Sequence, residues 1–186
     1  MNRRASVPRP RAEGVAIPTA EGMLGAPLYE AIARGLLDMG DPDEWDLLPS
    51  MGLLYTDGER VGMAVELPIP RKVWIGLEHP LHVVRWLART MSEDPDRPNF
   101  DKGPSLAAIW LVAEAWMRRV DPDEDDDHPC PADDPDRIEQ RLALVVGPES
   151  NGYASIDRGS EDVVMHYDAD GRLVAALRGL LAVMTG

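Results

Sequence analysis

The 186-residue sequence predicts an α+β fold, with an antiparallel or mixed sheet of five to seven strands and two or three helices covering one face. Several apolar segments of strand length are separated by turn residues, and a few others have apolar residues at helical spacing. The two kinds do not alternate regularly, as they would in a doubly wound parallel sheet. We expect a single domain over residues 27–186, preceded by an extended basic arm over residues 1–26.

Three segments have the apolar spacing of amphipathic helices. Pro27 and Pro80 each suit the first turn of a helix, where a missing N–H costs nothing, and Gly40 suits the position just after a helix. In the last segment Gly179 weakens a helix by about 1 kcal/mol relative to alanine. Its first residues would alternatively extend a hairpin at Asp170-Gly171. The predicted helices span residues 27–39, 80–92 and 173–184.

The strands are predicted from short apolar segments bounded by turn residues. Asp57-Gly58 marks a hairpin, and Asn151-Gly152 marks a turn. The segment Leu106–Met117 is apolar on both sides, so its periodicity does not separate helix from strand. Its alanines and Ser105 as a cap favour a helix, but the partner segment of similar length after residue 136 leads us to predict a central strand. The predicted strands span residues 53–56, 60–67, 106–117, 137–146, 153–157 and 162–167.

Charge is distributed unevenly along the chain. The sequence has 33 acidic and 19 basic side chains, for a formal net charge of −14. Nine of the acidic residues and no basic ones lie in residues 121–136. The rest of the chain therefore has 24 acidic and 19 basic residues. Residues 1–12 hold four arginines and no acid, and Pro8 and Pro10 favour polyproline-like backbone there. We therefore expect a nearly neutral body with a basic arm and an acidic loop.

These two segments and two tryptophans are the candidate contacts with a protein partner. Trp45 and Trp74 are expected in loops beside prolines, where an indole is free to dock, whereas Trp86, Trp110 and Trp116 are expected in the core. The candidate partner-binding residues are Arg3, Arg4, Arg9, Arg11, Trp45, Trp74, Asp123, Glu124, Asp125, Asp126 and Asp127.

A metal site is a weaker hypothesis. His79 and His82 form one pair of potential zinc ligands, and His128 and Cys130 form another. The alternative is structural: His79 precedes the helix that starts at Pro80, and His82 lies in its first turn. The acidic loop has the first half of an EF-hand spacing but lacks the glycine and the final glutamate that calcium binding needs. We expect no cofactor.

Glu114 is a charged residue inside an apolar segment, and burying an ionised carboxylate is costly unless it is paired. One interpretation makes it a general acid or base in a pocket. The other pairs it with an arginine of the neighbouring segment, such as Arg141, or places it at an open edge. The second interpretation is favoured, because structural ion pairs explain such residues more often.

Several classes of protein are disfavoured by what the sequence lacks. It has no dinucleotide-binding, P-loop, nucleophile-elbow or zinc-protease motif, and no markedly basic helix for DNA recognition. Its acidic balance argues against binding nucleic acid directly, and no apolar stretch approaches the roughly 20 residues that span a bilayer. With Cys130 as the only cysteine, no intrachain disulfide forms. We expect a cytoplasmic protein, or one inside an assembled viral particle.

The leading hypothesis is a non-enzymatic interaction or assembly protein that contacts another protein or its own copies as a homo-oligomer. The use of arginine over lysine suggests a GC-rich genome, and a viral structural or accessory role is one form of this hypothesis. One alternative is a metal-assisted hydrolase that uses His79, His82 and Glu114. The other is an acidic decoy that occupies a nucleic-acid-binding protein.

Overall fold

The computed structural model describes residues 17–18, 25–41, 43–56, 60–77, 79–93, 105–117, 137–166 and 170–186. Along this part of the chain the elements are β1 (Ile17–Pro18), α1 (Ala26–Asp38), β2 (Ser50–Thr56), β3 (Arg60–Glu66), α2 (Arg71–Leu77), α3 (Pro80–Glu93), β4 (Ser105–Met117), β5 (Ile138–Val146), β6 (Asn151–Asp157), β7 (Val163–His166) and α4 (Arg172–Thr185). The predicted α+β class is confirmed, with four described helices rather than two or three.

The strands form one sheet in the order β1-β3-β2-β4-β5-β6-β7, and every neighbouring pair is antiparallel. The prediction that residues 106–117 form a central strand is confirmed, because they make up most of β4. β4 is apolar on both sides because both of its faces are buried. Ile109 and Leu111 face one hydrophobic cluster, and Ala108 and Trp110 face another.

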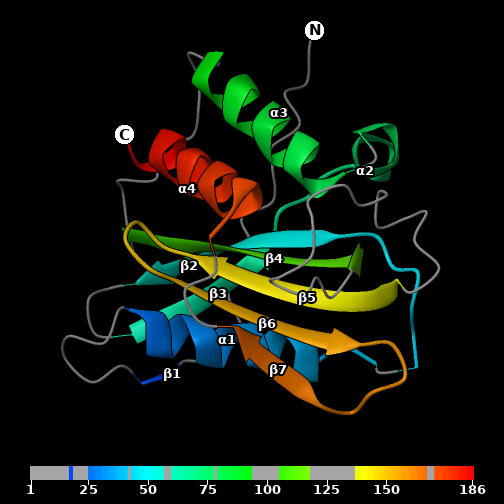
Figure 1. Ribbon diagram of the computed structural model, residues 1–186. Coiled ribbons are helices and arrows are strands. Elements are labelled where there is room, and N and C mark those ends of the chain that lie inside the picture. Colours follow the sequence, from blue (N-terminus) through cyan, green and yellow to red (C-terminus); the bar gives the residue numbers. More distant parts are fainter. Residues whose placement is uncertain are drawn as a thin grey trace, which may run out of the picture.

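Helices cover both faces of the sheet, whereas the sequence predicted cover on one face only. Figure 1 shows α2, α3 and α4 on one side and α1 on the other. The physical reason is the two-sided apolar character of β4 and β5, since each face of these strands must be shielded from water. α1 places Ile32 and Leu36 against one face, and α4 places Leu177 and Leu181 against the other.

The predicted helices over residues 27–39, 80–92 and 173–184 are confirmed as α1, α3 and α4 within one or two residues at each end. The short helix α2 was not predicted, since its seven residues lie in a segment where prolines indicated a loop. No described helix has the length and apolarity that crossing a bilayer requires.

Asn151-Gly152 is not the turn that the sequence indicated. The turn lies one step earlier, where the Gly147 N–H donates to the Ser150 carbonyl at 2.9 Å, and both residues of the pair belong to β6. Gly152 is required for a different reason. A Cβ atom there would lie 2.2 Å from backbone atoms of Tyr29 and Glu30, so the absence of a side chain lets α1 pack directly on β6.

Candidate functional site

A nearly buried ion pair joins the two central strands. The register places Glu114 of β4 opposite Arg141 of β5. Arg141 Nη2 lies 3.1 Å and Nε 3.3 Å from Glu114 Oε1, and the two side chains are only 6% and 10% exposed. This confirms the interpretation that an arginine on the neighbouring segment, Arg141, pairs with Glu114.

The same pair holds the chain between α1 and β2, residues 39–49, which we call the α1–β2 connection. Arg141 Nη1 donates to the Asp41 carbonyl at 3.1 Å, and Nη2 donates to the Glu44 carbonyl. Glu114 Oε2 accepts a 3.1 Å hydrogen bond from the Leu47 N–H. Three hydrogen bonds thus reach from the centre of the sheet to this connection, and we infer that they set its conformation.

Trp45 of the connection lies beside two guanidinium groups. The Arg141 guanidinium is 4.8 Å and that of Arg158 is 5.4 Å from the centre of its ring. Arg158 also pairs with Glu139 at 2.5 Å and with Asp46 at 3.6 Å. Its hydrogen bond to Glu139 raises the pKa of Arg158. The half-buried Trp45 ring therefore packs against two arginines of the same chain.

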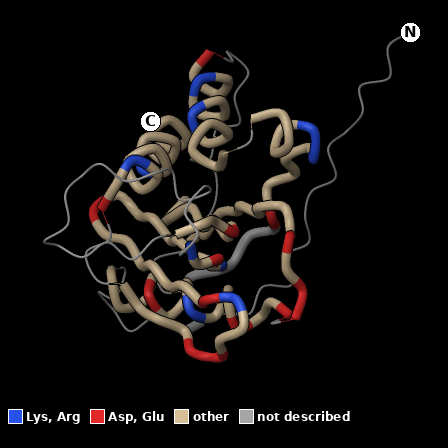
Figure 2. The backbone as a smooth tube through the Cα atoms, turned by 45° about the vertical axis from the view of Figure 1, so that its right-hand side comes forward, with Lys and Arg blue, Asp and Glu red and all other residues tan. Residues whose placement is uncertain are grey.

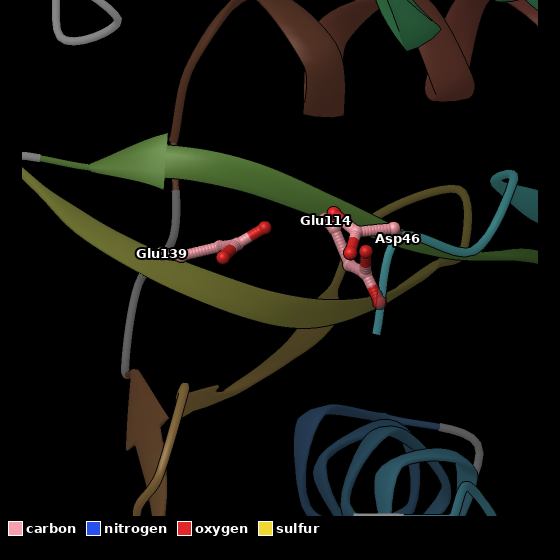
Figure 3. A group of neighbouring side chains, drawn as sticks. All are labelled: Asp46, Glu114 and Glu139. Carbon is pink, nitrogen blue, oxygen red and sulfur yellow. The ribbon is translucent and has the colours of Figure 1, made fainter. Parts of the chain in front are cut away.

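Three carboxylates meet at this point. Asp46, Glu114 and Glu139 each place an oxygen within 4.8 Å of the others, and Figure 3 shows them coming from the connection, β4 and β5. Such a cluster has the oxygen ligands that a hard divalent cation prefers. However, each carboxylate already has an arginine partner, Arg141 or Arg158, so a cation would have to displace these pairs. The arrangement is an ion-pair network.

A pocket of about 240 Å³ opens next to the ion pair, between the end of α1, the connection and the sheet. Glu114 and Arg141 form one part of its wall, and most of the rest is apolar. Trp110 also lines the pocket, and its buried indole Nε1 has no hydrogen-bond partner among the described residues. This nitrogen lies over Gly52 of β2, where a Cβ atom would be only 2.5 Å from it, so the indole N–H is covered by the body itself.

The rim of this pocket is apolar and exposed. Met39, Leu47 and Leu48 are 69%, 43% and 40% exposed, and all three line the pocket. Single exposed apolar side chains need no explanation, but a group of three around a pocket indicates a binding surface. No sequence signal identified this pocket and its rim, because their residues come from α1, β2, β4, β5 and the connection.

The two histidines lie where the sequence placed them, His79 just before α3 and His82 in its first turn. The Leu81 N–H donates to His79 Nδ1 at 3.0 Å at the start of α3, and His82 Nδ1 donates to the Leu77 carbonyl at 3.2 Å. Burial, and then the neighbouring His82, lower the pKa of His79. One nitrogen of each ring thus binds backbone. The other proposed ligands, His128 and Cys130, lie outside the described residues.

The prediction that Trp74 lies in a loop is wrong. Trp74 is part of α2, and its side chain is buried in the core. An amphipathic helix buries its apolar side, and this removes the indole from any partner. Of the tryptophans expected in the core, Trp110 is buried and Trp86 is half-buried. Trp116 is instead 41% exposed, with the Arg137 guanidinium 4.4 Å from its ring centre.

The remaining candidate partner residues lie outside the described part of the chain. They are Arg3, Arg4, Arg9 and Arg11 of the arm and Asp123, Glu124, Asp125, Asp126 and Asp127 of the acidic loop.

A second polar pair lies between β6 and β7. Ser155 Oγ and His166 Nε2 are 2.7 Å apart, and the imidazole stacks on Tyr153 with ring centres 4.2 Å apart. Burial lowers the pKa of His166, partly offset by the charge of Asp157. A serine beside a histidine has the chemistry of a nucleophile and its base. Ser155 is fully buried, however, so a substrate has no access to it in this conformation.

Thus the described surface combines one apolar pocket, a paired ion network in its wall and an exposed apolar rim. This arrangement suits the binding of another molecule better than it suits proton transfer, because both oxygens of Glu114 are occupied. Comparison with known proteins found no matching family model, no matching curated protein and no matching solved structure.

Proposed function

We propose that this protein is a non-enzymatic assembly protein whose body binds a protein segment at the pocket and its rim. The observation that carries the proposal is the exposure of Met39, Leu47 and Leu48 around an apolar pocket. An apolar side chain entering this pocket would gain about 25 cal/mol for each Å² that it removes from water. The partner we propose is a further copy of this chain.

Two features of the ion pair support binding over catalysis. Glu114 and Arg141 satisfy each other and the backbone of the connection, so neither group is free to exchange a proton with a substrate. The pair also fixes the segment that carries Leu47 and Leu48. A fixed surface binds more tightly, because less conformational entropy is lost on association.

The proposal is tested by placing charges on the rim of the full-length protein. We expect Leu47→Asp with Leu48→Asp to lower the molar mass measured by light scattering to that of a monomer, while the circular dichroism spectrum stays unchanged. Both side chains are exposed, so the folded body tolerates the change.

Ile75→Asp is the matched control, since Ile75 is 56% exposed on α2, on the opposite side of the sheet. It should leave the assembly intact. A wild-type protein that is monomeric at every concentration, or an assembly that the rim variant leaves unchanged, contradicts the proposal.

A further inference from the structure

The chemistry around the pocket selects the kind of segment that binds there. The α1–β2 connection and the last residue of α1 carry five exposed acidic residues and no basic one: Asp38, Asp41, Asp43, Glu44 and Asp46. Asp38 and Asp46 have arginine partners, but Asp41, Asp43 and Glu44 form no ion pair with a described residue. The pocket therefore combines an apolar interior with an acidic margin.

The opposite face of the molecule has the opposite sign. α2, α3 and α4 carry six basic residues and one acidic residue, namely Arg71, Lys72, Arg85, Arg89, Arg172, Arg178 and Glu93. Figure 2 shows mainly basic positions on these helices, and acidic positions together with a few basic ones toward the side of the sheet that α1 covers. A basic segment is thus attracted to the pocket side and repelled from the other face.

We infer that the pocket binds residues 3–11 of the N-terminal arm of this chain; the inference rests on the proposed function of the pocket. The segment reads Arg-Arg-Ala-Ser-Val-Pro-Arg-Pro-Arg, with four arginines around Val7, Pro8 and Pro10. Its charge is opposite to that of Asp41, Asp43 and Glu44, the three acids of the margin that pair with no described residue. Val7 and Pro8 are apolar, like most of the residues that line the pocket.

The backbone preference of the segment also suits binding in a pocket that Trp110 lines. Proline-rich segments favour the polyproline II conformation, whose carbonyl groups make no internal hydrogen bonds and project outward. Such segments bind grooves lined by aromatic rings with little loss of conformational entropy. Backbone preference and charge thus favour the same segment.

The arm is also long enough to reach. β1 begins at Ile17, beside Val61 of β3, and Val61 pairs with Thr56 at the far end of β2 from Ser50, which lines the pocket. Six residues of β2 span about 20 Å. The ten residues from Val7 to Ile17 span up to about 33 Å when extended. The arm of the same chain or of a neighbouring copy therefore has the required length.

Engineered disulfides in the full-length protein test the inference. In a Cys130→Ser background, Val7→Cys is combined with Leu48→Cys at the rim, or with Ile75→Cys on α2 as the matched control. Docking raises the local concentration of the two thiols, so the rim pair should cross-link about tenfold faster than the control pair. Equal rates for the two pairs overturn the inference.

Charge reversal supplies a second measurement. Arg3→Glu, Arg4→Glu, Arg9→Glu and Arg11→Glu together should slow cross-linking to the control rate, as should Asp41→Arg, Asp43→Arg and Glu44→Arg together. Combining both sets should restore it, and a combined variant that remains slow overturns the inference.

The cross-linked species separates this inference from the proposed function. A disulfide between chains supports both, whereas one within a chain supports docking of the arm but not assembly by it. If the rim variant abolishes assembly and the arm does not cross-link, the assembly function holds and the inferred occupant is wrong.

Discussion

Replacing Arg141 by methionine tests whether the buried ion pair holds the pocket together. Methionine fills the space of the guanidinium stem but leaves Glu114, 10% exposed, without its charge partner, and leaves the carbonyls of Asp41 and Glu44 without this donor. Breaking a buried pair in this way costs about 3–5 kcal/mol of unfolding free energy. With a denaturant slope of about 2 kcal/mol per molar urea, the midpoint should fall by about 1.5–2.5 M.

The assay is urea unfolding followed by circular dichroism, in a double-mutant cycle with Glu114→Gln. Glutamine keeps an oxygen for the Leu47 N–H but removes the charge. Because each single variant leaves a partner unsatisfied, the double variant should cost less than the sum of the singles by about 1–3 kcal/mol. Arg34→Met is the control, because Arg34 and its partner Asp38 are both more than half exposed, and its midpoint should stay near that of the wild type. An Arg141→Met midpoint equal to that of the wild type, or a cycle with no coupling, refutes the reasoning.

Two further predictions concern packing and pH. Gly152→Ala should lower stability by about 3 kcal/mol, because its Cβ would meet the backbone of Tyr29, whereas Gly179→Ala, with open space around it, should raise stability by about 0.5–1 kcal/mol. Melting temperatures measure both, and a Gly152→Ala protein as stable as the wild type would falsify the close approach of α1. The lowered pKa of His166 means that the unfolded state binds more protons as the pH falls through about 6.5. Stability should therefore decrease from pH 7 to pH 5, and less so in His166→Gln, whose amide can still bond to Ser155. Identical pH slopes in urea unfolding would contradict this assignment.

The Glu114–Arg141 pair shows how much of a tertiary contact the local sequence can predict. A charge inside an apolar strand demands a partner, and Arg141 on the next apolar segment was the natural candidate. The register of β4 and β5 was needed to place the two opposite each other. The apolar sequence around Glu114 showed that this residue needs a partner, and the pairing of β4 with β5 places Arg141 opposite it.

The sequence by itself determined the class of fold and most of its segments, because helical and strand periodicities are local properties of ten or so residues. Tertiary structure alone decided that both faces of the sheet are covered, that Gly152 lies under a helix and that Trp74 is core. It also brought Arg141, in the wall of the pocket, to the carbonyl of Asp41, which is 100 residues away in the chain. Contacts over such separations depend on the packing of whole elements, and no local period records them.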